Sequence, residues 1–156
     1  MKYRLIALDI DGTIRSPDHP LSYRTRKTIE SVMEAGSIVT LVTGRVFRSA
    51  LTLSTQLKIK SPIVTFQGAH IADPMTGKVM WHQPLSPEMV RTALDALVSW
   101  NLQVLAYSGD LVYANELTPW VVAYGKRNQI EVHIAQDLKE LASCELTRLV
   151  VVGSQN

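Results

Sequence analysis

Two carboxylates separated by one residue, Asp9 and Asp11, follow a short apolar run near the start of the sequence. Side chains two positions apart at the end of a strand point the same way, so both carboxylates are expected to face one ligand. Gly12 then allows a sharp backbone turn close to that ligand. A carboxylate can accept a phosphoryl group, and a second one nearby can transfer protons. Two anions would repel a phosphate, so the pattern calls for a cation, for which Mg²⁺ is the natural candidate.

A second polar group, Thr43-Gly44-Arg45, follows another apolar run and precedes a predicted helix. A hydroxyl and exposed backbone N–H groups at a helix N-terminus form a phosphate cradle. The plainer alternative is a capped helix start with Thr43 as the N-cap and Arg45 exposed. The first group has its own plain alternative, an acidic turn, because Asp-Gly is a common turn dipeptide. Found together after two strands, the two groups favour a site that handles phosphate.

The elements that position these residues alternate between strand and helix. Apolar runs over 3–8, 38–42 and 62–66 predict buried strands. Helices are predicted from Ser22 to Gly36 and over 46–57. This order is typical of right-handed crossovers on a parallel sheet, where ligands bind at the carboxyl ends of the strands. Asp9, Thr43 and Gln67 each follow a predicted strand, so one rim of the sheet should hold all three.

The second half of the chain has a different pattern. Prolines at 84 and 87 mark a boundary, and the sequence predicts two domains, 1–84 and 85–156. Beyond the boundary, helices are expected after Ser86, Thr118 and Asp137. A hairpin is expected over 104–107 and 111–114, with further strands over 130–134 and 149–152. This mixture indicates an α+β domain rather than a continued parallel sheet.

Composition narrows the class of protein. The chain has 156 residues, 46% of them hydrophobic and 19% charged, as in ordinary globular proteins. A net charge of +2 gives no electrostatic footprint for nucleic acid. The apolar run before Asp9 is too short for a signal peptide or a membrane span, and the single Cys144 suits a reducing environment. We therefore expect a cytoplasmic protein without a nucleic-acid or membrane partner.

These motifs resemble those of the haloacid dehalogenase superfamily, and more closely its Cof-like branch. Residues 8–13 (LDIDGT) match the opening motif of that branch, and residues 41–45 (LVTGR) match the second. Residues 63–69 resemble the signature of its third strand, although Asn is usual where Gln67 stands. The resemblance implies an α/β, Rossmann-like parallel-sheet core, of which 1–84 is the N-terminal portion. It identifies 85–156 as an incomplete α/β cap domain.

The resemblance also implies roles. Asp9 would be the nucleophile that forms an aspartyl-phosphate, and Asp11 the acid and base. Mg²⁺ would be held by the Asp9 carboxylate and the Asp11 backbone carbonyl. The substrate would be a small phosphorylated metabolite such as a sugar phosphate. Residues implied in substrate binding are Gly12, Thr13, Thr43, Gly44, Arg45, Gln67 and Gly68, of which Thr43 and the Gly44 N–H would bind the phosphoryl oxygens.

Two later motifs of the family, a lysine and an acidic Gly-Asp stretch, have no match. We therefore expect a chain truncated within the cap, with impaired activity by itself. The strand over 3–8 would have an exposed apolar edge that favours self-association. Two other functions stay open: a non-catalytic phosphate-binding or interaction module derived from such a phosphatase, and a response-regulator-like phosphoacceptor domain. The second fits less well, because it explains neither Thr43-Gly44-Arg45 nor the α+β half.

Overall fold

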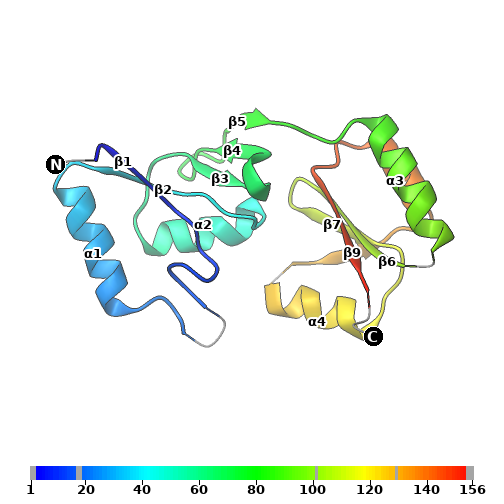
Figure 1. Cartoon of the computed structure of the whole chain (residues 1–156), viewed down its shortest axis with the longest axis horizontal. Helices are drawn as coiled ribbons and strands as arrows, with labels where there is room; N and C mark the ends of the chain where they lie inside the picture. Colours follow the sequence, from blue (N-terminus) through cyan, green and yellow to red (C-terminus); the bar gives the residue numbers. More distant parts are fainter. Residues whose placement is uncertain (1–2, 17–18, 101, 129, 154–156) are drawn as a thin grey trace. The chain divides into compact units, whose positions relative to one another are not determined.

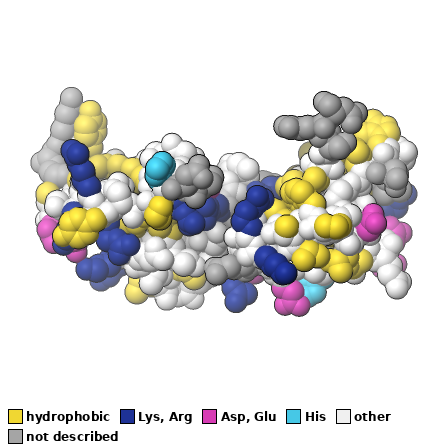
Figure 2. All heavy atoms as spheres, turned by 90° about the horizontal axis from the view of Figure 1, so that it is seen from below, with side chains coloured by type: hydrophobic (Ala, Val, Ile, Leu, Met, Phe, Trp, Pro, Cys, Tyr) yellow, Lys and Arg dark blue, Asp and Glu magenta, His cyan; other side chains and the backbone are white. Residues whose placement is uncertain are grey.

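The computed structural model describes residues 3–16, 19–100, 102–128 and 130–153. The chain divides into two compact units, Met1–His82 and Gln83–Asn156. Figure 1 shows the elements of each. No helix in the described part of the chain is long and apolar enough to cross a bilayer. On the face drawn in Figure 2, lysine and arginine side chains are dispersed among other side chains rather than gathered into one stripe.

The first unit begins with alternating strands and helices: β1 (Leu5–Leu8), α1 (Tyr23–Glu34), β2 (Ile38–Leu41), α2 (Phe47–Gln56) and β3 (Ile63–Thr65). β1 and β2 are parallel, with Leu5 opposite Ile38 and Leu8 opposite Leu41. A parallel bridge between Val42 and Val64 then links the end of β2 to β3. The crossover order predicted from the sequence is confirmed, and it places the carboxyl ends of the three strands next to one another.

A short 3₁₀ turn, η1 (Phe66–Gly68), leads from β3 into β4 (His70–Ala72) and β5 (Val79–His82). These two strands extend β3 as an antiparallel sheet in the order β3-β4-β5. β4 and β5 therefore form a hairpin around the turn at 74–77.

One hydrophobic cluster joins the sheet and helices of the first unit. The apolar faces of α1 and α2 pack in this cluster, and the Ser22 side chain caps α1 by accepting from the Thr25 N–H. The cluster has these buried members: Ile10, Ile29, Val39, Leu41, Ala50, Leu53, Leu57, Ile59 and Ile63. Ile10 belongs to the loop after β1, so the core itself anchors the segment that carries Asp9 and Asp11.

The second unit is built around a four-stranded sheet in the order β8-β7-β6-β9. Its elements are α3 (Pro87–Ser99), β6 (Gln103–Ser108), β7 (Leu111–Ala114), α4 (Pro119–Asn128), β8 (Val132–Ile134), the 3₁₀ helix η2 (Leu138–Ser143) and β9 (Arg148–Val152). β6 is antiparallel to β7 and β9, whereas β7 and β8 are parallel. Buried residues of α3, β6 and η2 share one cluster. The predicted mixture of hairpin and helices is confirmed.

Candidate active site

The polar residues of both motifs lie where neighbouring strands end. The Val42 N–H donates to the Leu8 carbonyl at 2.9 Å, and the Thr43 N–H donates to the Val64 carbonyl at 3.0 Å. Asp9 follows β1, Thr43 follows the end of β2, and Gln67 lies in η1 directly after β3. The three segments predicted to share one rim are therefore joined there by hydrogen bonds.

The loop after β1 exposes its two carboxylates and buries the residue between them. Asp9 and Asp11 are exposed, whereas Ile10 is fully buried in the core. The Ile10 carbonyl accepts from three N–H groups, those of residues 13, 14 and 15. Gly12 has a φ of +80°, a conformation that a side chain would strain. The Thr13 hydroxyl donates to Asp9 Oδ2 at 3.1 Å, which fixes one oxygen of that carboxylate.

Arg45 binds Asp11 through two parallel hydrogen bonds. Arg45 Nε donates to Asp11 Oδ2 at 2.7 Å, and Nη2 donates to Oδ1 at 2.6 Å. Nη1 of the same guanidinium donates to Ser49 Oγ at 3.2 Å. The hydrogen bond from Arg45 lowers the pKa of Asp11 below its ordinary value, because it favours the ionised carboxylate, although partial burial opposes this. The sequence predicted neither the ion pair between Arg45 and Asp11 nor the hydrogen bond from Arg45 to Ser49. The hydrogen bond could have been predicted, because Ser49 lies four residues after Arg45 and such residues are neighbours on a helix.

The segment from Thr43 to Arg45 is a turn that precedes the helix. The helix predicted over 46–57 is confirmed as α2, which has Val46 as its N-cap and starts at Phe47, whereas the alternative with Thr43 as the N-cap is wrong. The Thr43 hydroxyl accepts from the Arg45 N–H at 3.2 Å. The carbonyls of Thr43 and Arg45 accept from the N–H groups of residues 67 and 66. These bonds to η1 hold the turn in a non-helical conformation and leave Thr43 almost completely buried.

Gln67 lies against Gly44. A Cβ atom added at Gly44 would be only 2.8 Å from Gln67 Nε2, so a side chain at position 44 would displace the Gln67 carboxamide. The contact depends on an unusual backbone, because Phe66, Gln67 and Gly68 have φ values of 51°, 52° and 100°. Such left-handed conformations are costly for residues other than glycine and occur preferentially at functional sites. The sequence predicted Gln67 at this rim, but not its left-handed backbone or its contact with Gly44.

The contacts thus form two sets that share one residue. The acidic loop joins Asp9 to Thr13 and Asp11 to Arg45. The turn joins Thr43 and Gly44 to the segment around Gln67, with Gly68 next in the chain. Arg45 belongs to both sets, because its backbone is bound in the turn and its side chain is bound to the loop.

The residues present suit a hard cation of the Mg²⁺ type. Among the described residues, no group of three or more His, Cys, Asp or Glu side chains is placed to hold a metal ion. Mg²⁺, however, usually keeps several waters and takes one or two carboxylates together with substrate phosphate. The exposed Asp9 carboxylate and the backbone carbonyl of Asp11, in the same loop, are oxygen ligands of this kind.

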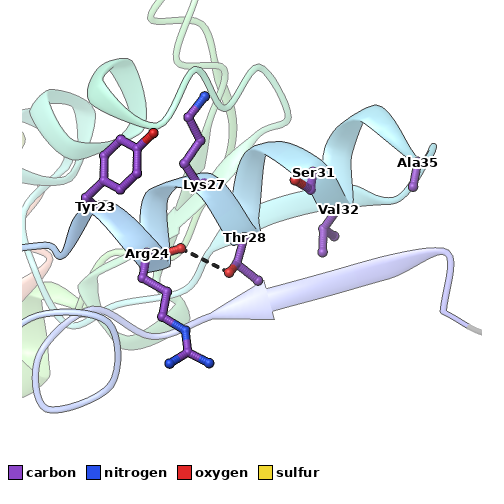
Figure 3. A pocket seen from close by; sticks show the side chains of 7 residues that line it. All are labelled: Tyr23, Arg24, Lys27, Thr28, Ser31, Val32 and Ala35. Carbon is purple, nitrogen blue, oxygen red and sulfur yellow. Dashed lines mark hydrogen bonds between the residues drawn. The ribbon is translucent and has the colours of Figure 1, made fainter.

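A surface hollow of about 630 Å³ lies elsewhere in the first unit, along α1. Figure 3 shows the side chains that line it: Tyr23, Arg24, Lys27, Thr28, Ser31, Val32 and Ala35. None of these residues belongs to the two polar motifs, so this hollow is separate from the candidate site.

Comparison with known proteins shows what the chain resembles. It is 31% identical over 149 residues to the 5-amino-6-(5-phospho-D-ribitylamino)uracil phosphatase YitU of Bacillus subtilis, covering 94% of this chain and 55% of that protein. It is 27% identical over 158 residues to the HMP-PP phosphatase of Cronobacter sakazakii, covering 98% and 56%. The chain therefore spans little more than half the length of these relatives.

Solved structures show the same fold. A haloacid dehalogenase-like hydrolase from Bacteroides thetaiotaomicron superposes with a TM-score of 0.82 at 24% identity, over 97% of this chain and 59% of that one. TM0651 from Thermotoga maritima gives 0.81 at 22% identity, over 97% and 57%. The family model for haloacid dehalogenase-like hydrolases matches residues 6–152, that is, both units. The chain belongs to the haloacid dehalogenase-like hydrolase family.

Proposed function

We propose that this protein acts in the Mg²⁺-dependent hydrolysis of a small phosphorylated metabolite through an aspartyl-phosphate. The observation that carries the proposal is the loop after β1, in which the buried Ile10 anchors two exposed carboxylates that flank it. Two relatives are named as phosphatases, one of a phosphorylated ribitylaminouracil and one of HMP-PP, which supports a small phosphorylated substrate. The proposed setting is the cytoplasm, which suits the free thiol of Cys144.

In the proposed reaction, a carboxylate oxygen of Asp9 attacks phosphorus while the bond from phosphorus to the leaving alcohol breaks. Thr13 binds Asp9 Oδ2, so the other oxygen is the nucleophile. Asp11 gives a proton to the leaving oxygen and later takes one from the water that hydrolyses the acyl phosphate. Inorganic phosphate and free Asp9 are the products of the second step.

The remaining site residues are proposed to hold the phosphoryl group. Thr43 and the Gly44 N–H would bind its oxygens, with Gly12, Thr13, Arg45, Gln67 and Gly68 around them. The Asp9 carboxylate and the Asp11 backbone carbonyl would hold Mg²⁺, which when bound supplies positive charge against the phosphate. In this proposal residues 1–84 are the N-terminal portion of the core domain and residues 85–156 are part of a cap.

Replacement of Asp9 by Asn tests this function. We expect Mg²⁺-dependent turnover of p-nitrophenyl phosphate by the unaltered chain, at a low rate, and none by Asp9→Asn. Phosphate binding, measured by calorimetry, should survive the substitution. Asp110→Asn, at the exposed turn between β6 and β7, is the matched control and should keep the unaltered rate.

The alternative, a non-catalytic phosphate-binding module, gives a different result. The unaltered chain would then show no turnover, and both it and Asp9→Asn would bind phosphate with similar affinity. A chain that neither turns over substrate nor binds phosphate would refute both functions.

We also propose self-association through the outer edge of β1. The carbonyl oxygens of Arg4 and Leu8 accept hydrogen bonds from N–H groups at the two ends of β2. The backbone N–H and C=O groups of Leu5 and Ala7 therefore point to the opposite edge of β1. Among the described residues, β2 is the strand that pairs with β1. Leu5 is 58% exposed, and an apolar open edge favours pairing with another chain.

Light scattering after gel filtration measures this association. The unaltered chain should elute with a mass above that of a monomer, and Leu5→Lys should shift it toward the monomer. Met89→Lys, on the exposed face of α3, introduces the same charge in the second unit and should have no effect. A monomeric unaltered chain would contradict the proposal.

A further inference from the structure

The guanidinium of Arg45 is engaged on all three of its nitrogens. Nε and Nη2 occupy both oxygens of Asp11, and Nη1 binds Ser49 Oγ. Paired, parallel hydrogen bonds from a guanidinium to a carboxylate are stronger than bonds between neutral groups and fix the geometry of both partners. In this arrangement the Asp11 carboxylate is oriented by Arg45 rather than by the loop that carries it.

This arrangement conflicts with the tasks that the proposed function gives to the two residues. Asp11 must present an oxygen to the leaving group, and Arg45 must lie near the phosphoryl group. While Nε and Nη2 of Arg45 donate to Asp11, these two donors cannot also bind the phosphoryl group. The pair must therefore open, at least on one side, when a phosphoanion enters.

Resting on the proposed function, we infer that Arg45 is a positioning residue that exchanges partners: it holds Asp11 until a phosphoanion enters the turn at Thr43 and Gly44, and then binds that anion. The backbone of Arg45 is part of the same turn, fixed by the Thr43 hydroxyl and by the Phe66 N–H. An anion bound to Thr43 and Gly44 would therefore lie beside Arg45, the next residue of the turn, whose side chain holds Asp11.

Exposure and charge both allow this exchange. The side chains of Arg45 and Asp11 are 24% and 55% exposed, so solvent reaches the pair and weakens it relative to a buried pair. A phosphate dianion carries more charge than a carboxylate and accepts the same paired donors. Ser49 stays bound to Nη1 and provides a pivot on α2.

A double-mutant cycle on inorganic phosphate affinity tests the exchange. Asp11→Asn removes a negative charge, which strengthens phosphate binding whether or not Arg45 is present. If Asp11 also competes with phosphate for Arg45, Asp11→Asn must increase the phosphate affinity more in the protein with the native Arg45 than in the Arg45→Ala protein. We expect the two gains to differ by about threefold or more, as for residues in direct contact. Calorimetry at low salt measures all four proteins, and circular dichroism confirms that each is folded.

Arg48 provides the matched control. It is exposed on the first turn of α2 and carries the same charge. Asp11→Asn should give the same gain with Arg48→Ala as with the native Arg48. A reduced gain there too would mean that net positive charge, not the pair, is responsible, and would overturn the inference.

Nuclear magnetic resonance of the arginine Nε–Hε group gives a second measurement on the unaltered chain. The Arg45 signal, assigned by its loss in Arg45→Lys, should move when inorganic phosphate is added. It should already be displaced in Asp11→Asn without phosphate.

The outcomes separate this inference from the proposed function. Phosphate binding with equal gains in both backgrounds, or without a change in the Arg45 signal, overturns the exchange but leaves the proposed function standing. No phosphate binding by any of the proteins overturns the proposed function, and the exchange with it.

Discussion

Replacing Ile10 by Ala should destabilise the first unit more than any exposed change in the same sheet. Ile10 is fully buried in the cluster that joins β1, β2, α1 and α2, and it lies between the two carboxylates of the loop. Removing a buried isoleucine side chain to alanine typically costs about 2–5 kcal/mol, because apolar burial is lost and a cavity remains. Since domains are stable by only about 5–15 kcal/mol, this is a large fraction of the total.

Urea unfolding followed by circular dichroism measures the loss, and amide hydrogen exchange in β1 and β2 assigns it to this unit. With an m-value of about 1.5 kcal/mol per molar urea, the midpoint should fall by roughly 1–3 M. Ile38→Ala is the matched control, because Ile38 lies in β2 but its side chain is 55% exposed. It should change stability by no more than about 0.5 kcal/mol. Equal effects of the two substitutions would refute the view that the core anchors the acidic loop through Ile10.

Three further changes test other contacts. Thr40→Val removes the partly buried hydrogen bond from its hydroxyl to the carbonyl of the residue before β3, at 2.6 Å, and should cost about 1 kcal/mol in urea unfolding. Tyr107→Phe removes the 2.6 Å bond between the hydroxyls of Tyr107 and Tyr124 and should cost a similar amount. Because burial raises the pKa of Tyr107 above its ordinary 10.0, stability should fall as the pH rises above about 10, and less so in Tyr107→Phe. Arg45→Ala should raise the pKa of Asp11, measured by a carbon-detected titration, because the hydrogen bond from Arg45 lowers it. The stability that this ion pair contributes is present above pH 3.8, the ordinary pKa, and is lost as the pH falls through the lower pKa that Asp11 has in the folded protein.

Much of the fold follows from patterns that are local in the sequence. The strand and helix order of the first unit, the cap at Ser22 and the hairpin of the second unit were predicted because apolar periodicity and turn residues act over a few positions. The predicted α/β fold and family are confirmed by the family match and the superposed structures. One boundary was less accurate, because β1 begins at Leu5 rather than at residue 3.

The sequence by itself determined which side chains carry chemistry: Asp9 and Asp11 after one strand, and Thr43, Gly44 and Arg45 after another. Their types and spacing are local properties, and the crossover rule predicts that the strand ends meet. Only the tertiary structure decided which of them touch. Arg45 binds Asp11 across 34 positions of sequence, and Gln67 covers Gly44 through a left-handed turn. Such contacts depend on the register of parallel strands and on side-chain directions at their ends, neither of which a local pattern contains.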